Sequence, residues 1–245
     1  MDMATRDELG QPNVNAVIYD LDGVLVSTDE YHYLAWKRLA DEEKIPFDRA
    51  INERLRGVSR MDSLAIILEL STRRYSEEER RALADRKNGY YVESLQALGP
   101  AAVLPGARET VDALRVLGLL QAVASSSKNA PTILARTGIA DLFDTSIDGS
   151  MITRSKPDPE VFLKAAESLG VSPGNCVVVE DAVSGVQAAN AAGMRAFAVA
   201  SAARADEQAE SADRSSTHAW KRAPDLSGNS LIAAIQPYIH MRQSM

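Results

Sequence analysis

The chain has little cysteine, no excess of basic side chains and no long apolar run. Among its 245 residues Cys176 is the only cysteine, which excludes a disulfide within the chain and suits a reducing compartment. The formal net charge of -7 argues against broad binding of nucleic acid, which needs a basic face. No apolar run has the length of a membrane span, and Met1 to Pro12 is too polar for a signal peptide. We therefore expect a soluble, cytoplasmic protein without a nucleic-acid or membrane partner.

The composition is that of an ordinary globular protein. Hydrophobic residues make up 45% of the chain and charged residues 25%, which is enough apolar material for a sizeable core. The acidic balance still permits a small anionic substrate. A few local cations and a metal ion can reverse the sign of the field inside a cleft.

Predicted strands and helices alternate along most of the chain. Short apolar runs that stop at acidic residues, hydroxyls or glycine are typical of buried strands. Segments with helical spacing separate them and end at glycine, as at Gly118 and Gly170. The predicted strands are 16–19, 120–124, 176–179 and 195–200, and the predicted helices are 107–117, 159–169, 184–192 and one that begins with Asn129 as its N-cap. The pattern predicts an α/β fold with a Rossmann-like parallel sheet core and helices on both faces.

Residues 29–98 interrupt this alternation. They contain no convincing strand and read as amphipathic helices at 29–44, 62–70 and 76–98, the last opening with a capping box at Ser76 and Glu79. We interpret them as an inserted all-helical cap domain, with residues 1–28 and 99–245 forming the α/β catalytic core. The polar segment 204–222 is either a helix over the sheet or a surface segment.

Two acidic pairs follow predicted strands. Asp20 and Asp22 lie two apart after the first strand, so the pleat points both the same way, toward the crevice at the carboxyl ends of the strands. One carboxylate can attack phosphorus and the other can move protons, although such pairs are often only solvated loop residues. Glu180 and Asp181 end another strand. Together these oxygens suit Mg²⁺, while the second pair could alternatively cap the next helix.

Two further strand ends offer groups that bind phosphate. Ser125, Ser126 and Ser127 present hydroxyls and backbone N–H groups where a helix begins, which is an anion site or a plain N-cap. Lys156 lies in a loop stiffened by two prolines, which would hold its ammonium in place against a transferring phosphoryl group. A lone loop lysine is usually a solvated charge. The agreement of all four strand ends predicts a phosphoryl-transfer site.

The four motifs, in this order, resemble those of the haloacid dehalogenase superfamily. The resemblance covers nearly the whole chain, and the insertion after the first motif resembles that superfamily's helical cap. Within the superfamily the cap is similar to that of the β-phosphoglucomutase family. The stretches that carry this similarity are Glu30-Tyr31-His32, Ala35-Trp36-Lys37, Gly57-Val58-Ser59-Arg60, Asp62-Ser63-Leu64, Arg86-Lys87-Asn88 and Ser125-Ser126-Ser127-Lys128-Asn129.

The resemblance implies a role for each matching core residue. Asp20 would be the nucleophile that is phosphorylated, and Asp22 the general acid/base for the sugar oxygens. Magnesium would be held by Asp20, the backbone carbonyl of Asp22, Glu180 and Asp181. The transferring phosphoryl group would be bound by Ser125 and Lys156.

The cap resemblance implies a distal phosphate site and a hinge. Arg60 would grip the non-transferring phosphate, for which an arginine fork is suited. Thr28 would lie at the hinge, and His32 and Lys87 would couple substrate entry to the positioning of Asp22. Substrate contacts are also implied for Gly57, Val58, Ser59, Ser127 and Asn129, and Trp36 is a cap residue for which core packing is the alternative.

The implied activity is interconversion of β-D-glucose 1-phosphate and β-D-glucose 6-phosphate. Glucose 1,6-bisphosphate would be both the activating phosphoryl donor and the intermediate, and the enzyme would be a monomer whose partner is a small sugar phosphate. The alternatives are a magnesium-dependent sugar-phosphate phosphatase with the same core and a non-catalytic sugar-phosphate-binding protein. The chain departs from the family at Ser27, Arg56, Asp158 and Ala182. These departures bear on substrate preference and remove no required group.

Overall fold

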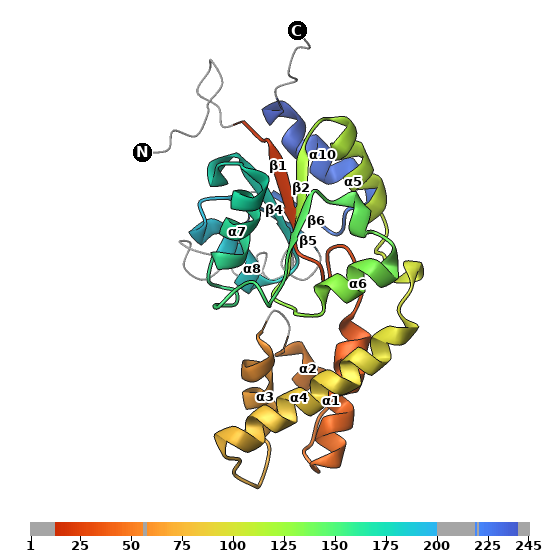
Figure 1. Cartoon of the computed structure of the whole chain (residues 1–245), viewed down its shortest axis with the longest axis vertical. Helices are drawn as coiled ribbons and strands as arrows, with labels where there is room; N and C mark the ends of the chain where they lie inside the picture. Colours follow the sequence, from red (N-terminus) through yellow and green to blue (C-terminus); the bar gives the residue numbers. More distant parts are fainter. Residues whose placement is uncertain (1–12, 56–57, 200–218, 220, 240–245) are drawn as a thin grey trace.

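A parallel sheet forms the centre of the computed structural model, which describes residues 13–55, 58–199, 219 and 221–239. Six strands pair in the order β3-β2-β1-β4-β5-β6, and all pairs are parallel (Figure 1). The strands are β1 Ala16–Tyr19, β2 Leu120–Ala124, β3 Thr145–Ile147, β4 Cys176–Glu180, β5 Arg195–Val199 and β6 Lys221–Ala223. The predicted α/β fold is confirmed.

Helices cover both faces of this sheet. The α-helices of the core that the described residues form are α5 Ala107–Val116, α6 Ala130–Thr137, α7 Glu160–Leu169, α8 Val183–Ala191 and α10 Ser230–Ile235. Short 3₁₀ helices link the elements: η1 Leu95–Ala97, η2 Pro100–Ala102, η3 Ala140–Leu142, η4 Pro173–Asn175, η5 Ser227–Asn229 and η6 Gln236–Tyr238. Successive side chains of a strand point to opposite faces, so Val17 and Tyr19 join the cluster under α5, α6 and α10, and Ala16 and Ile18 join the one under α7 and α8. Figure 1 shows α7 and α8 on one side of the sheet and α5 and α10 on the other.

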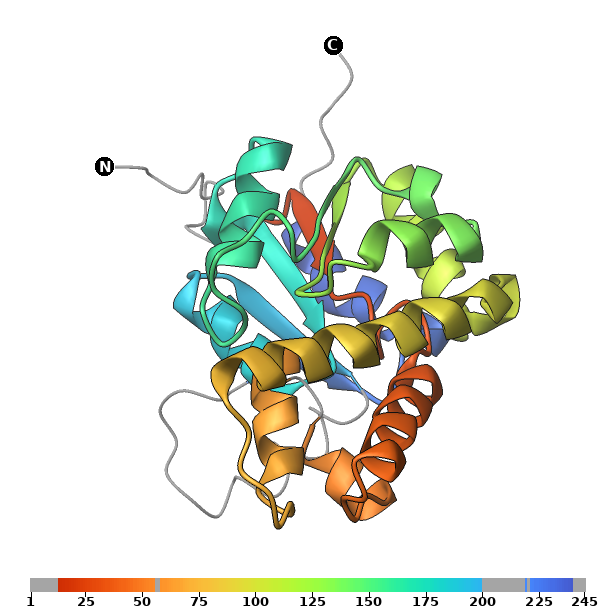
Figure 2. The ribbon, with the colours of Figure 1, turned by 60° about the horizontal axis from the view of Figure 1, so that its bottom comes forward.

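The insertion between β1 and α5 is entirely helical in its described part. It contains α1 Asp29–Glu42, α2 Arg49–Glu53, α3 Arg60–Leu68 and α4 Glu77–Ser94, with its own apolar cluster around Trp36, Leu64 and Ile67. The capping box at Ser76 and Glu79 is present, with both reciprocal hydrogen bonds. Figure 1 shows the insertion beyond the carboxyl ends of the strands, and in Figure 2 α4 crosses in front of these ends. Among the described residues, no helix is both long and apolar enough to cross a membrane.

Several elements differ from the sequence-based prediction. Strands β3 and β6 and helices α2 and α10 were not predicted, since each is only three to six residues long. The strands lie at the sheet edges, where a strand need not be apolar throughout. Lys221 and Arg222, the end of the polar segment 204–222, begin β6, and 204–218 and 220 lie outside the described residues. Asn129 is the N-cap of α6, but its side chain makes no cap hydrogen bond.

One polar pair lies within the sheet core. The Tyr19 hydroxyl donates to Gln121 Oε1 at 2.8 Å, and the Gln121 amide donates to the Val111 carbonyl oxygen at 2.8 Å. Both side chains are fully buried. A buried acceptor that loses its donor retains the full cost of its desolvation. The Tyr19 hydroxyl therefore contributes to the stability of the folded chain.

We therefore expect Tyr19→Phe to lower the free energy of unfolding by about 1–3 kcal/mol, because Gln121 Oε1 loses its partner. Urea denaturation measures the change. The matched control is Tyr33→Phe, whose ring contacts are kept and whose hydroxyl makes no hydrogen bond within the described part of the chain. That control should stay within about 0.5 kcal/mol of the parent. Equal effects of the two variants would contradict the prediction.

Candidate active site

A cleft of about 740 Å³ lies between the carboxyl edge of the sheet and the helical insertion. Its walls combine side chains from four separate segments of the core with side chains from α1, α3 and α4. The predicted site residues that line it are Asp20, Asp22, Ser125, Ser127, Asn129, Lys156, Glu180 and Asp181 from the core and His32, Trp36, Val58, Ser59, Arg60 and Lys87 from the insertion. Thr28 contacts the cleft through Asp22, and Gly57 lies outside the described residues.

Lys156 links the first acidic pair to the second. Its Nζ donates to Asp20 Oδ1 at 2.5 Å and to Glu180 Oε1 at 2.6 Å, and only 7% of its side chain is exposed. Burial would lower the pKa of Lys156, but the two carboxylates raise it above its ordinary value, so the ammonium stays charged. Burial likewise raises the pKa of Asp20 to about 7, against the opposing effect of the Lys156 charge. The site holds more negative charge than one lysine neutralises.

Three carboxylates are arranged as a metal site would require. Single oxygens of Asp20, Glu180 and Asp181 all lie within 4.8 Å of one another. Burial, followed by the charges of Glu180 and Asp20, holds the pKa of Asp181 well above its usual range. A divalent cation among these oxygens would relieve that repulsion, and an all-oxygen set is the one that Mg²⁺ prefers. The donor set therefore fits magnesium; the contribution of the Asp22 backbone carbonyl stays a prediction.

Two glycines let the chain pack directly against these carboxylates. A Cβ on Gly185, in α8, would lie 1.7 Å from Glu180 Oε1, and one on Gly23 would lie 2.3 Å from Asp181 Oδ2. The other Glu180 oxygen accepts the backbone N–H groups of Asp181 at 2.6 Å and Ala182 at 2.9 Å. Glu180 thus also binds the backbone just before α8, but it does not cap that helix, because the N-cap is Ala182 and no side chain makes a cap hydrogen bond there. Ala182 departs from the family only in its side chain, and this contact uses its backbone.

Asp22 is oriented by the segment that enters the insertion. The Thr28 hydroxyl donates a short hydrogen bond to Asp22 Oδ1, and Thr28 is itself buried immediately before α1. Burial raises the pKa of Asp22, and the Thr28 hydrogen bond opposes that rise. A carboxyl group with a raised pKa is suited to exchanging protons near neutral pH. Ser27, where the chain departs from the family, is exposed.

The turn after β2 presents hydroxyls to the cleft. The Ser125 hydroxyl accepts the Ser127 backbone N–H at 3.1 Å, and the Ser127 hydroxyl accepts that of Asn129 at 3.2 Å. The Ser126 hydroxyl is buried, lines the cleft and has no hydrogen-bond partner among the described residues. Donors and hydroxyls grouped before a helix can bind an oxyanion.

The insertion contributes cations to the opposite wall. Arg60 is the first residue of α3, after the N-cap Ser59, and is half-buried in the cleft. Lys87 Nζ lies 2.9 Å from His32 Nδ1 and 4.7 Å from the centre of the Trp36 ring. Trp36 is also part of the apolar cluster of the insertion, so it packs in that core as the alternative for this residue stated. Burial, and then the charge of Arg60, lowers the pKa of Lys87 to about 7.

Some cleft residues were assigned no role from the sequence, although two of them belong to the stretches that resemble the family. Lys128 and Asn88 line the cleft, and the Asn129 side-chain amide donates to Asn88 Oδ1 at 3.1 Å, joining core to insertion. Tyr91 is buried, and its ring stacks on His32 with centroids 4.0 Å apart. Lys128 could have been found because it lies between two predicted residues. The position of Tyr91 depends on how α4 packs on α1, which no local pattern predicts.

The close approach of Gly185 gives a test of the metal site. We expect Gly185→Ala to displace the Glu180 carboxylate and to weaken Mg²⁺ binding about 10- to 100-fold, as loss of a group that orients a ligand does. Titration calorimetry with MgCl₂ measures this. The control is Gly89→Ala in α4, where, apart from its chain neighbours and the nearby backbone of α4, no atom of the described residues lies within 4 Å of the added Cβ. Unchanged Mg²⁺ affinity in a folded Gly185→Ala protein would contradict the assignment.

The lowered pKa of Lys87 predicts a pH dependence of stability. Between pH 7 and about 10.4 the unfolded chain keeps this proton while the folded chain loses it, so stability rises with pH. We expect the free energy of unfolding to rise by up to about 1.4 kcal/mol per pH unit relative to Lys87→Met. Urea denaturation at pH 7, 8 and 9 tests this. The control is Lys44→Met, which replaces an exposed lysine. Its free energy of unfolding should change with pH as that of the parent does. The prediction would be refuted if the free energy of unfolding of Lys87→Met changed with pH as that of the parent does.

Comparisons with known proteins agree with this geometry. Residues 14–193 match the family model described as haloacid dehalogenase-like hydrolase. The chain is 44% identical over 188 residues to the β-phosphoglucomutase of Bacillus subtilis, covering 76% of this chain and 83% of that protein. It is 31% identical over 184 residues to a phosphorylated carbohydrates phosphatase of Thermotoga maritima, covering 74% of this chain and 82% of the other.

A solved structure shows the same overall arrangement. The crystal structure of the β-phosphoglucomutase from Clostridium difficile superposes with a TM-score of 0.79 at 34% identity, covering 92% of this chain and 98% of that one. The match extends across both the sheet and the insertion, since almost all of each chain is covered. The family match spans the strand ends that carry the acidic pairs, the serines and Lys156. The chain belongs to the haloacid dehalogenase-like hydrolase family.

Proposed function

We propose that this protein is a β-phosphoglucomutase, which interconverts β-D-glucose 1-phosphate and β-D-glucose 6-phosphate. The observation that carries the proposal is the presence of cations on opposite walls of one cleft, Lys156 beside Asp20 and Arg60 on the insertion. A mutase must hold two phosphates of a bisphosphate at once. The 44% identity to the B. subtilis β-phosphoglucomutase supports the same activity.

In this proposal Asp20 is the nucleophile. Its carboxylate oxygen accepts a phosphoryl group, and Lys156 and the Ser125 turn neutralise charge that develops on the transferring oxygens. Mg²⁺, when bound by Asp20, Glu180, Asp181 and the Asp22 carbonyl, supplies further electrostatic stabilisation of that charge. Asp22 removes the proton from the attacking sugar hydroxyl and returns it in the reverse step.

The second half of the reaction needs the distal site. Phosphorylated Asp20 donates to β-glucose 1-phosphate and forms the 1,6-bisphosphate, which then turns so that the phosphate formerly bound by Arg60 faces Asp20. Arg60 would hold whichever phosphate is not transferring. It would be assisted by Val58, Ser59, Ser127 and Asn129 and by Gly57, which lies outside the described residues. Return of the phosphoryl group to Asp20 leaves β-glucose 6-phosphate. Glucose 1,6-bisphosphate is accordingly both intermediate and activating donor.

The helical insertion would act as a cap. We assign residues 29–98 to it and residues 1–28 and 99–245 to the catalytic core. Thr28, the last residue before α1, binds Asp22, so movement of the insertion is coupled to the acid/base. The His32–Lys87 pair lies on the cap beside it. Closure would protect phosphorylated Asp20 from water while the bisphosphate turns. We further propose a monomeric, cytoplasmic enzyme.

The second candidate is a sugar-phosphate phosphatase with the same core. It is favoured by the relative from T. maritima, whose name is that of a phosphorylated carbohydrates phosphatase. In a phosphatase water attacks phosphorylated Asp20, so no second phosphate has to be held. The two functions thus differ in their need for Arg60.

The direct test is ³¹P NMR of the protein with Mg²⁺, β-glucose 1-phosphate and a trace of β-glucose 1,6-bisphosphate. A mutase produces the glucose 6-phosphate resonance without inorganic phosphate. Inorganic phosphate as the main product would establish the phosphatase instead. If neither resonance grows while Asp20 accepts phosphate from other phosphorylated sugars, glucose is the wrong sugar.

Arg60→Ala then separates the two functions. We expect its mutase kcat/KM to fall about 10- to 100-fold, the loss typical of a hydrogen bond to a charged group. The control is Arg54→Ala, which removes an exposed arginine paired with Glu69 on the same insertion and should change the rate little. A mutase rate unaffected by Arg60→Ala would remove Arg60 from the distal site.

A further inference from the structure

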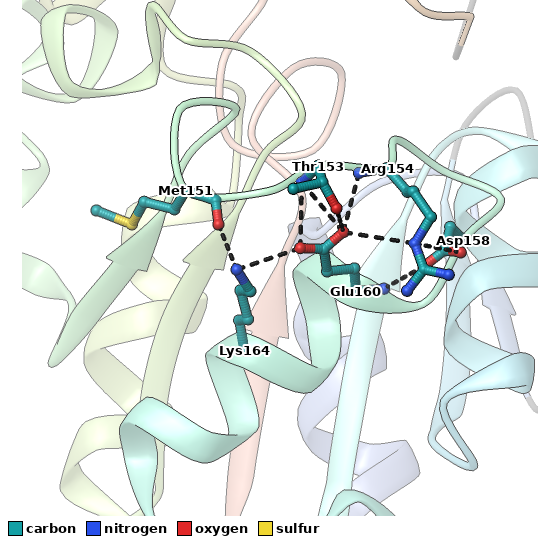
Figure 3. A network of polar contacts seen from close by, with 6 residues as sticks. All are labelled: Met151, Thr153, Arg154, Asp158, Glu160 and Lys164. Atoms are coloured by element: carbon teal, nitrogen blue, oxygen red, sulfur yellow. Dashed lines mark hydrogen bonds and ion pairs between the residues drawn. The ribbon is translucent and has the colours of Figure 1, made fainter.

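The loop that leads to Lys156 is bonded to α7, and most of these hydrogen bonds go to Glu160 (Figure 3). Both oxygens of the Glu160 carboxylate lie 3.1 Å from the backbone nitrogen of Thr153, which donates to them. Oε2 also accepts the Thr153 hydroxyl at 2.9 Å and the backbone N–H of Arg154 at 2.9 Å. One carboxylate therefore fixes two consecutive peptide units just before Lys156.

The chain that follows Lys156 is bonded to the same residue. The backbone N–H of Glu160 donates to Asp158 Oδ1 at 3.0 Å, and Arg154 Nε lies 3.2 Å from Asp158 Oδ2. The segment before Lys156 is thus held by the Glu160 carboxylate, and the segment after it by the Asp158 carboxylate, which accepts the Glu160 backbone N–H. Asp158, one of the departures from the family, has a structural partner here.

A lysine of α7 holds the carboxylate and the loop together. Lys164 lies one turn after Glu160; its Nζ is 3.2 Å from Glu160 Oε1 and donates a short hydrogen bond to the Met151 carbonyl oxygen. Burial opposes ionisation of Glu160, but the hydrogen bonds from Thr153 and Arg154 outweigh it and lower the pKa of Glu160 to about 2. The carboxylate is therefore ionised throughout the pH range in which the protein would work.

Fixing this backbone matters because Lys156 reaches the site on a flexible side chain. Its ammonium must lie 2.5 Å from Asp20 and 2.6 Å from Glu180 at the same time. A lysine side chain has four rotatable bonds, so a shift of its Cα moves the ammonium away from both carboxylates. A glutamate that served only the helix dipole of α7 would have no need to bond residues six and seven positions earlier.

We propose that Glu160 is a positioning residue for phosphoryl transfer, whose carboxylate fixes the backbone before Lys156 and so holds the ammonium against the transferring group. The inference rests on the proposed roles of Asp20 and Lys156. It applies to a mutase and to a phosphatase, because both begin with phosphorylation of Asp20.

The test compares Glu160→Gln and Glu160→Ala with the parent. The first readout is phosphorylation of Asp20 by acetyl phosphate and Mg²⁺: an Asp20 oxygen bonds to phosphorus, acetate leaves, and intact-mass spectrometry follows the product. The second is steady-state kcat and KM with the sugar phosphate that the protein turns over. The matched control is Glu167→Gln, which removes the same charge from an exposed position of α7.

We expect kcat and the phosphorylation rate to fall about 10- to 100-fold, as misplacement of a catalytic group by about 1 Å does. Glutamine keeps one acceptor oxygen, so the loss with Glu160→Gln should be smaller than with Glu160→Ala. KM should stay within about twofold, because the groups that hold the distal phosphate are untouched.

Three results would overturn the inference. Rates for both Glu160 variants that equal those of Glu167→Gln would show that Lys156 needs no such support. A fall in kcat accompanied by an equal rise in KM and a lowered Tm would show a purely structural role. Failure of the parent protein to accept phosphate on Asp20 would refute the proposed function, and the inference with it; the parent measurement therefore separates the two failures.

Discussion

The Lys156 ammonium, shared between Asp20 and Glu180, is the interaction on which the site depends. It is the one cation that bonds directly to the acidic cluster within the described residues, and it is almost fully buried. Removal of one partner from a buried charge pair is costly, because the remaining charge has no water to solvate it. Burial raises the pKa of Asp20 and Asp181, and the surplus of negative charge that the cluster keeps adds to that rise. That surplus is what makes the cluster receptive to a divalent cation.

The surrounding fold brings these charged groups together and buries them. β1 and β4 are adjacent in the sheet, so their carboxyl ends deliver Asp20 and Glu180 to one point. Gly185 lets α8 approach the Glu180 carboxylate closely. The insertion closes the opposite wall with Arg60 and Lys87, and Thr28 connects it to Asp22. Core and insertion are therefore two halves of one electrostatic arrangement.

Much of this arrangement could be predicted from the chain. The buried strands end in acidic residues or serines, and strands that are apolar throughout indicate a parallel sheet covered on both faces. The short strands β3 and β6 escaped prediction because edge strands of three residues carry no clear pattern. Asn129 was expected to cap α6 with its side chain. Its amide instead bonds Asn88 across the cleft, a partner 41 positions away that a local rule cannot identify.

The sequence by itself determined the type of chemistry. Two acidic pairs, a serine turn and a lysine between prolines, each placed where a predicted strand or loop ends, are sufficient to indicate phosphoryl transfer with a metal ion. The tertiary structure decided which groups form hydrogen bonds, ion pairs and ring contacts with one another. Whether Lys156 bonds Glu180, whether Tyr91 stacks on His32, and whether Glu160 holds the loop before Lys156 all depend on the packing of distant segments. The physical reason is that hydrogen bonds and pKa shifts are set by distance and burial, and both are properties of the folded chain.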